Sequence, residues 1–291
     1  MNKFIFMLLF LFSFSYLVIA SEESENKFKS AMSFYDRQEM PEAIATAKEA
    51  IALDPKVSIY YTFIGNIYDY LKQYDEGEKY FNQALKINPR DPGALNGLGE
   101  VYNFRRLYSK SIEMYKKAIK FAPDYYGVYI NIGVAYIELY EKNKNIKDLY
   151  YAKEYLEKSI TLNNKAYDGY GYLGKVYLDS YDYENAVKSL EKSISLNPNP
   201  DRYYGDLEDT YYNLGSAYYN LKRYKEAINA LQESLKIKPN APDAILALGA
   251  SYVYVGDKEK AIEKLKELES LDPEKALILN KFVVKRFSVG E

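Results

Sequence analysis

One short motif in this sequence has the spacing of a nucleotide-binding loop. Residues 169–174 read Gly-Tyr-Gly-Tyr-Leu-Gly, a G-x-G-x-x-G pattern of the kind that holds the phosphates of dinucleotides. That use needs a β-strand directly before the glycines and a helix after them, and no strand pattern precedes Gly169. The motif therefore does not predict a cofactor, and we expect none.

The side chains that most often carry out catalysis are missing from the composition. The sequence has no cysteine and no histidine, which removes thiol nucleophiles, the usual zinc ligands and the one side chain that ordinarily titrates near pH 7. Aspartate and glutamate are plentiful, but no pair of them is marked as an acid and base for hydrolysis, and most fall on predicted solvent faces of helices. We predict that the protein is not an enzyme and binds no metal.

The charge balance argues against nucleic acid as a partner. Lysine and arginine number 39 and the acidic residues 41, which gives a formal net charge of −2. Proteins that bind nucleic acid usually present a basic face, and the lysines here are scattered.

The elements that would position any functional residue repeat along the chain. Residues 211–239 read as two short helices with a break at Lys222–Arg223, because apolar and small residues recur at helical spacing on both sides of it. Pro239 then ends the second helix. The glycine of the first helix recurs at steps of 34, 34, 41, 41 and 34 residues, as Gly65, Gly99, Gly133, Gly174, Gly215 and Gly249. Glycine inside a helix is unfavourable by about 1 kcal/mol against alanine, so we expect it to mark a tight packing contact.

This pattern resembles the tetratricopeptide repeat, whose signature is W-x2-L-G-x2-Y, then A-x3-F, then P, with a 34-residue period. The resemblance covers residues 24–275 and implies an all-α, right-handed α-solenoid of about seven helix-turn-helix repeats with a C-terminal capping helix. The implied repeats, followed by a capping helix and tail at 276–291, are 24–57, 58–91, 92–125, 126–166 with an insertion, 167–200, 208–241 and 242–275.

Two excesses of seven residues interrupt the period. The first lies near residues 141–148, where the Lys/Asn-rich composition favours a solvated loop over a longer first helix. The second lies at about Asp201–Leu207, and seven residues are close to two helical turns, so they can lengthen a helix without rotating its faces. Residues 274–287 read as one more helix, either a cap on the stack or a docking face for a partner or a second copy.

The N-terminus has the features of a secretory signal peptide. Lys3 precedes an apolar stretch at residues 4–19, and small residues before Ser21 indicate cleavage after Ala20. The alternative is an uncleaved membrane anchor, because the stretch approaches spanning length. Both interpretations place the remaining chain outside the cytoplasm, periplasmic or secreted, and membrane attachment follows only from the second.

The resemblance also assigns a partner-binding surface, since repeats of this family line a concave groove with their first helices. The matching groove positions proposed as the site are Tyr35, Asn66, Tyr70, Asn96, Glu100, Phe104, Lys175, Tyr212, Tyr219 and Tyr254. Further slots of the same groove hold Thr62, Asp69, Asn103, Ile137, Glu138 and Ser216. Tyrosine offers a large contact area and a hydroxyl group, and the sequence has 34 of them, although composition alone also explains such a number.

The groove composition bears on the kind of partner. Some relatives hold a peptide's terminal carboxylate with Lys, Arg and Asn, and here only Asn66 and Lys175 match that set. A protein or peptide segment with aromatic, aliphatic or basic side chains fits better. The predicted function is a non-catalytic scaffold or adaptor of an extracytoplasmic assembly. Self-assembly into a homo-oligomer through the apolar C-terminal helix, and carbohydrate binding by the tyrosine-rich surface, are the alternatives.

Overall fold

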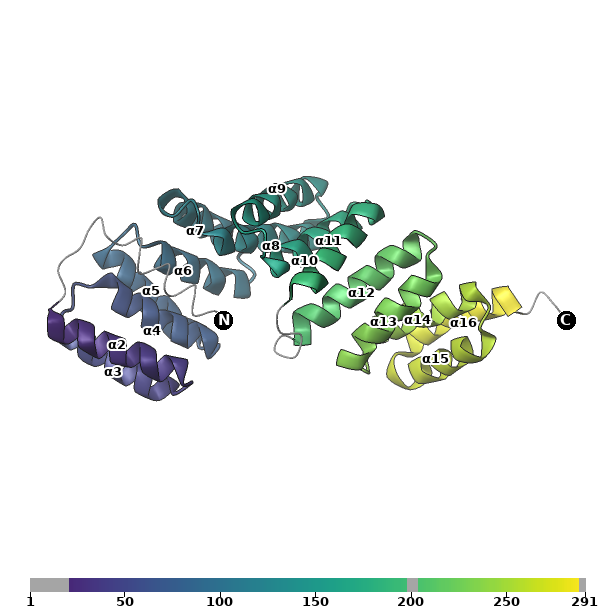
Figure 1. The fold of residues 1–291 in the computed structure, drawn as a ribbon, viewed down its shortest axis with the longest axis horizontal. Coiled ribbons are helices and arrows are strands. Elements are labelled where there is room, and N and C mark those ends of the chain that lie inside the picture. The colour runs from purple at the N-terminus through teal and green to yellow at the C-terminus, as the bar shows by residue number, and fades with distance from the viewer. Residues whose placement is uncertain (1–20, 198–203, 288–291) are drawn as a thin grey trace. The chain divides into compact units, whose positions relative to one another are not determined.

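The computed structural model describes residues 21–197 and 204–287, and within them every regular element is an α-helix (Figure 1). The predicted all-α solenoid class is confirmed. The chain divides into two compact units, residues 1–143 and 144–291. The helices of the first unit are α2 (Glu22–Asp36), α3 (Met40–Leu53), α4 (Ser58–Tyr70), α5 (Tyr74–Ile87), α6 (Pro92–Phe104), α7 (Tyr108–Phe121) and α8 (Tyr126–Asn143). Those of the second are α9 (Ile146–Leu162), α10 (Tyr167–Asp179), α11 (Tyr183–Leu196), α12 (Tyr204–Asn220), α13 (Tyr224–Ile237), α14 (Pro242–Val255), α15 (Lys258–Leu271) and α16 (Pro273–Phe287).

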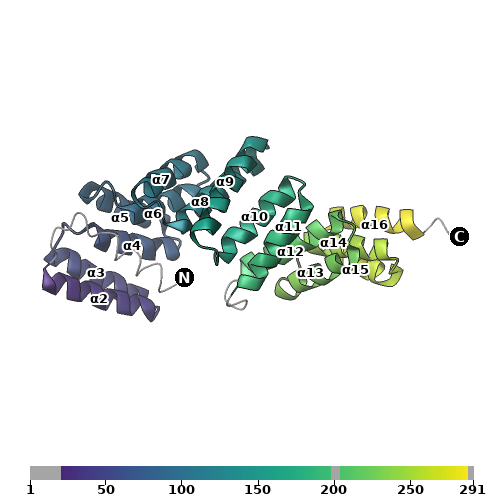
Figure 2. The same ribbon diagram turned by 45° about the horizontal axis from the view of Figure 1, so that its top comes forward.

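Within each unit, consecutive helices pack side by side as hairpins, for example α4 with α5 and α12 with α13 (Figure 2). The tight turns need one residue in the left-handed region, since this conformation reverses the chain after a helix. In α12 the backbone N–H of Arg223 reaches back to the carbonyl of Tyr218 at 2.9 Å, and Lys222 has φ 61°. The predicted break at Lys222–Arg223 is confirmed. The corresponding turn residues elsewhere are Gln38, Lys72, Arg106, Lys144, Tyr181 and Gly256.

Phe81 of α5 fills the space between two first helices. Its side chain is fully buried, and a Cβ atom built on Gly65 of α4 would lie 2.6 Å from a carbon of its ring. A Cβ atom on Gly97 of α6 would overlap the same ring. The close contact predicted for the repeat glycine is therefore present at Gly65, and the partner is an aromatic ring of the second helix.

Polar contacts also join neighbouring hairpins of the first unit. The buried Asp91 caps α6 by accepting the N–H groups of Gly93 at 3.0 Å and Ala94 at 3.1 Å, and it accepts the hydroxyl of Thr62 in α4 at 2.9 Å. Because one carboxylate serves both as helix cap and as bridge, it fixes the start of α6 against α4.

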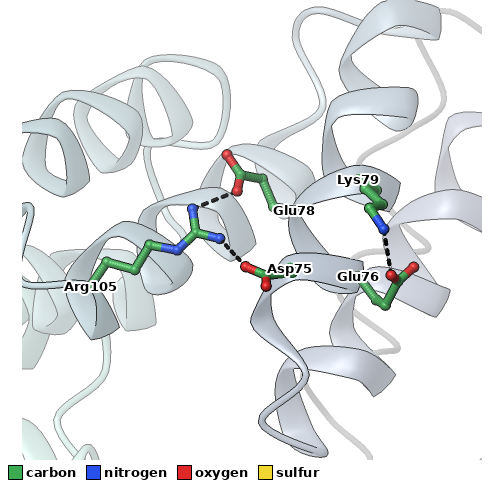
Figure 3. Close-up of polar contacts among 5 residues, drawn as sticks. All are labelled: Asp75, Glu76, Glu78, Lys79 and Arg105. Atoms are coloured by element: carbon green, nitrogen blue, oxygen red, sulfur yellow. Dashed lines mark hydrogen bonds and ion pairs between the residues drawn. The ribbon is translucent and has the colours of Figure 1, made fainter.

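A second link comes from the turn between α6 and α7. Arg105 places its two terminal nitrogens 2.5 Å from Asp75 and 2.5 Å from Glu78, both on α5 (Figure 3). Lys79 pairs with Glu76 on the same helix, at 2.5 Å. The guanidinium group thus ties one hairpin to the next and has both of its ends engaged.

The first seven-residue excess is helical, so the favoured prediction of a protruding loop is wrong. α8 runs to Asn143 and α9 begins at Ile146, and these helices have 18 and 17 residues against 13 in α6. An exposed helix face can be as rich in lysine and asparagine as a solvated loop, so composition alone does not distinguish the two. The side chain of Asn145 caps α9 by accepting the N–H of Lys147 at 3.2 Å.

The second excess falls partly outside the described residues. From Tyr204 onward it belongs to α12, which has 17 residues, so the interpretation as a helix extension holds for that part. Positions 201–203 lie outside the described residues, as does the leader at residues 1–20. Among the helices that the structure describes, none is long and apolar enough to cross a membrane.

The last helix, α16, packs on the hairpin formed by α14 and α15. Ala276, Leu279 and Val283 are buried, and a Cβ atom on Gly249 of α14 would lie 2.5 Å from a methyl carbon of Leu279. The helix therefore covers the side of α14 that another hairpin would otherwise cover, as predicted for a cap. Its other face leaves Leu277, 64% exposed, in solvent.

Candidate functional site

The ten proposed groove residues all lie on first helices of the hairpins. In the first unit Tyr35 lies on α2, Asn66 and Tyr70 on α4, and Asn96, Glu100 and Phe104 on α6. In the second unit Lys175 lies on α10, Tyr212 and Tyr219 on α12, and Tyr254 on α14. Within a unit, neighbouring first helices are in contact, α4 with α6 and α12 with α14, so their residues form a shared face.

Two of the aromatic residues on this face are paired with a tyrosine that starts the preceding second helix. Phe104 stacks on Tyr74 with ring centroids 3.7 Å apart, and Tyr254 stacks on Tyr224 at 4.6 Å with an angle of only 7° between the planes. Tyr219 packs edge-on against both members of the second pair at 5.6 Å. Part of the tyrosine richness therefore serves to join hairpins, and the outer ring faces remain available to a partner.

Tyr35 and Tyr70 differ in how much they offer to a partner. Tyr35 is half-buried and lies edge-on to Phe63, with centroids 5.7 Å apart, so it contributes to the core of the first hairpins. Tyr70 is 54% exposed and Phe104 is 59% exposed. Tyr70 and Phe104 therefore present a larger apolar surface to a partner than Tyr35 does, and they lie on the face of α4 and α6.

Lys175 and Tyr212 line a cleft of about 260 Å³ between α10, α11 and α12 in the second unit. The Lys175 ammonium group lies 3.1 Å from the carboxylate of Asp179, one turn away on α10. Burial raises the pKa of the Tyr212 phenol. Gly171, the central glycine of the G-x-G-x-x-G motif, lies inside α10 and lines this cleft. A Cβ atom there would lie 3.2 Å from Oγ of Ser193 and 3.6 Å from Oγ1 of Thr210, so the glycine permits a close approach between helices.

A hydrogen-bonded cluster of amides and a carboxylate occupies the face of α6 and α8. The amide of Asn96 donates to Oε1 of Glu100 at 2.9 Å. The amide of Asn131, on α8, donates to that same oxygen at 3.0 Å and to the carbonyl oxygen of Asn96 at 3.0 Å. Burial raises the pKa of Glu100, and these amide donors oppose the rise by stabilising the charged form.

Asp69 of α4 faces this cluster from the neighbouring hairpin. Burial, with the negative charge of Glu100 beside it, raises the pKa of Asp69 to about 7. Its Oδ1 atom is buried and accepts no hydrogen bond, and the same holds for Oδ1 of Asn103, one turn beyond Glu100 on α6. The carboxyl groups of Asp69 and Glu100 therefore lie close together on the groove face, where they are poorly solvated.

The sequence-based site is incomplete in two respects. Asn131 was not proposed, because it lies one position away from the groove slot that the family pattern gives. Asp69 and Glu100 were both assigned to groove slots, but the sequence did not identify them as an interacting pair. The only signal was that both occupy groove slots of adjacent repeats. No group of three or more His, Cys, Asp or Glu side chains that could hold a metal ion occurs in residues 21–197 and 204–287.

Comparisons with known proteins agree with this architecture. A family model described as tetratricopeptide repeat matches residues 58–91 and 208–241, and a second model of the same description matches residues 92–125 and 167–200. The chain therefore contains tetratricopeptide repeats and folds as an α-solenoid built from them. A comparison with curated proteins finds no match.

Several solved structures share the fold. A chain of the APC/C hetero-tetramer Cut9–Hcn1 is 21% identical over 87% of this chain with a TM-score of 0.69, and this chain spans 48% of its length. The pilF protein of Pseudomonas aeruginosa is 14% identical, with 77% of this chain and 96% of that one covered and a TM-score of 0.66. PilW, a type IV pilus biogenesis factor, is 20% identical, with 77% and 98% covered and a TM-score of 0.64.

Proposed function

We propose that this protein is a non-catalytic scaffold that holds a segment of a partner protein against the first helices of its repeats. Tetratricopeptide repeats generally mediate protein–protein interactions, which supports a binding function of this class. The observation that carries the proposal is the exposure of Tyr70 and Phe104, at 54% and 59%, on adjacent first helices. Large aromatic side chains with this exposure provide contact area at low conformational cost.

We also propose that the protein acts outside the cytoplasm, in an envelope or secreted assembly. The support is the leader, in which Lys3 precedes an apolar stretch and small residues precede Ser21. PilW, whose fold is similar, is described as a type IV pilus biogenesis factor, which is compatible with an assembly role. Fractionation of cells that express the full chain tests this, with mass spectrometry of the N-terminus. A mature chain that begins at Ser21 is expected, and an intact leader in the cytoplasmic fraction refutes it.

Affinity capture from native envelope extract tests the binding proposal. The parent protein and a Tyr70→Ala, Phe104→Ala variant serve as baits. A matched control carries Tyr150→Ala and Tyr181→Ala, because those tyrosines are 65% and 75% exposed but lie away from the first helices, on α9 and in a hairpin turn. The parent and the control should retain the same partner, and the groove variant should lose it. Equal retention by all three baits contradicts the proposed groove.

Self-association is the second candidate, and a specific surface favours it. Leu277, Ile278 and Val284 of α16 are 64%, 43% and 50% exposed, and Leu277 and Val284, seven residues apart, lie on the same face of the helix. Sedimentation velocity of the mature chain over a range of concentrations tests it. A concentration-dependent increase in mass that Leu277→Glu abolishes supports a homo-oligomer, and a monomer at every concentration excludes it.

A further inference from the structure

The most unusual polar site of the molecule lies on the face formed by α4, α6 and α8. We call it the acidic cleft, and it consists of Asp69, Asn96, Glu100, Asn103 and Asn131. Direct hydrogen bonds of 2.9–3.0 Å join the asparagines at 96 and 131 to Glu100. Asp69 comes from the preceding hairpin and interacts with the carboxyl group of Glu100.

Two buried acceptor oxygens in the acidic cleft have no hydrogen-bond donor. The amide of Asn96 donates to Glu100, and the amide of Asn131 donates to Glu100 and to the carbonyl oxygen of Asn96. Oδ1 of Asp69 and Oδ1 of Asn103 are both buried, and neither receives a hydrogen bond. A buried acceptor without a donor is unfavourable, so a donor from a bound molecule would stabilise both oxygens.

The surroundings of the acidic cleft supply no positive charge. The groups that interact with its carboxyl groups from packed elements are the neutral phenols of Tyr74 of α5, Tyr115 of α7 and Tyr125 before α8. The pKa values of the three phenols are raised, first by burial and then by the nearby carboxylates. No lysine or arginine in the described part of the chain forms an ion pair with Asp69 or Glu100.

The nearest arginine in the sequence is held elsewhere. Arg105 follows α6 directly, but its guanidinium group is bound to Asp75 and Glu78 at 2.5 Å each (Figure 3). Because both of its ends are engaged by carboxylates of α5, it is not available to neutralise the acidic cleft.

We propose that the acidic cleft receives the side chain of a lysine or arginine from the bound partner segment. The inference rests on the proposed function, since it names the partner residue that this part of the groove recognises. An ammonium or guanidinium group donates several hydrogen bonds and carries a positive charge. It therefore supplies donors to the buried oxygens of Asp69 and Asn103, and its charge stabilises the ionised form of the two carboxyl groups. We prefer a basic side chain to a metal ion, because the described residues hold no group of three or more His, Cys, Asp or Glu side chains that could bind one.

The test uses a small cation, so that it does not depend on knowing the partner. The full mature chain, labelled with ¹³C, is titrated with n-butylguanidinium, and the carboxyl resonances of Asp69 and Glu100 are followed by NMR across pH. The neutral isostere n-butylurea is the matched ligand control. Bound cation should lower the titration midpoint of the pair by about one pKa unit or more, since a positive charge within hydrogen-bonding distance favours the ionised form. Butylurea should leave the midpoint unchanged.

Variants separate the site from general charge effects. Asp69→Asn with Glu100→Gln removes both charges and keeps similar shapes, so the cation should no longer perturb the amide resonances of Asn103 and Asn131. Asp124→Asn, an exposed aspartate in the turn before α8, should leave those perturbations intact. If butylguanidinium has no effect on the parent, or if butylurea has the same effect, a proton shared between the two carboxyl groups satisfies the cleft and the proposal is overturned.

This result is distinguishable from a failure of the proposed function. A groove that retains its partner in the capture experiment while the cleft ignores butylguanidinium leaves the scaffold function standing and removes only the basic-residue inference. If the cleft binds the cation but the protein retains no partner, the cation site stands and the scaffold function is contradicted. If both hold, Asp69→Asn with Glu100→Gln should lose the captured partner and the Asp124→Asn control should keep it.

Discussion

At the scale of single residues, Asp69 makes the stability of the protein depend on pH in an unusual direction. Its pKa is raised to about 7 by burial and by Glu100, whereas an aspartate in an unfolded chain has a pKa of about 3.9. Between these values the folded state holds a proton that the unfolded state releases. The contribution of this group is therefore fully present below about pH 4 and is lost as pH rises through about 7.

Replacing the carboxyl group of Asp69 should remove this loss of stability at high pH. We predict that Asp69→Asn raises the free energy of unfolding by about 1–2 kcal/mol at pH 8 and has little effect at pH 4. Urea denaturation followed by circular dichroism at both pH values measures it. The exposed Asp124→Asn variant is the control and should show no such difference between the two conditions. A gain that is the same at both pH values contradicts the assignment.

The glycine beside Phe81 provides a second prediction for single residues. Alanine favours a helix over glycine by about 1 kcal/mol, but at Gly65 the new methyl group would lie 2.6 Å from the ring of Phe81. The ring has little room to move, because it is fully buried and also packs closely against Gly97. Overpacking of this kind usually is unfavourable by about 1–3 kcal/mol, so we expect Gly65→Ala to destabilise the protein by about that amount.

Gly127 is the matched control for this substitution. It also lies in a first helix, α8, but a Cβ atom there would be 3.5 Å from the nearest atom of Tyr125, an ordinary contact. Gly127→Ala should therefore stabilise the protein by a few tenths to about 1 kcal/mol. Thermal unfolding measures both variants. If steric fit decides the outcome, the unfolding temperature falls for Gly65→Ala and rises for Gly127→Ala. A rise for both variants would show that helix propensity alone decides it.

At the scale of elements, the sequence predicts the helices and turns that are determined by residues close together along the chain. The small and aromatic residues at helical spacing, the terminating prolines and the turn at Lys222–Arg223 are local signals, and the helices they predict are present. The extension of α8 and α9 was missed because an exposed helix and a loop have the same Lys/Asn composition. The pairing of Asp69 with Glu100 was missed for a different reason: it depends on the register between two hairpins, which no local pattern contains.

The capping role of α16 can be tested through its two faces. Leu279 is fully buried against α14, so we predict that Leu279→Ala lowers the free energy of unfolding by about 2–4 kcal/mol, as is usual for a buried leucine. Leu277→Ala, on the exposed face of the same helix, should change it by less than about 0.5 kcal/mol. Urea denaturation with both variants measures the difference. Similar losses at both positions would show that the outer face is also covered in solution.

At the scale of the whole molecule, each hairpin contacts mainly its neighbours along the chain. α5 contacts α4 and α6, and α15 contacts α14 and α16. Stability in such an array is approximately a sum of the contributions of single repeats and of the interfaces between neighbours. A defect in one hairpin should therefore weaken the adjacent interfaces first, while distant hairpins keep their protection.

Phe81→Ala is a sharp test of this organisation, because the ring joins α4, α5 and α6 and is fully buried. The cavity should lower local stability by about 3–5 kcal/mol. Hydrogen exchange measured by mass spectrometry on the full chain should show faster exchange in peptides from α4, α5 and α6, while peptides from α13 to α16 exchange at the parent rate. Leu279→Ala provides the reciprocal control, with faster exchange confined to α14, α15 and α16. If either variant accelerates exchange evenly along the chain, the protein unfolds as one cooperative block, and partner binding at one hairpin would then be felt at all of them.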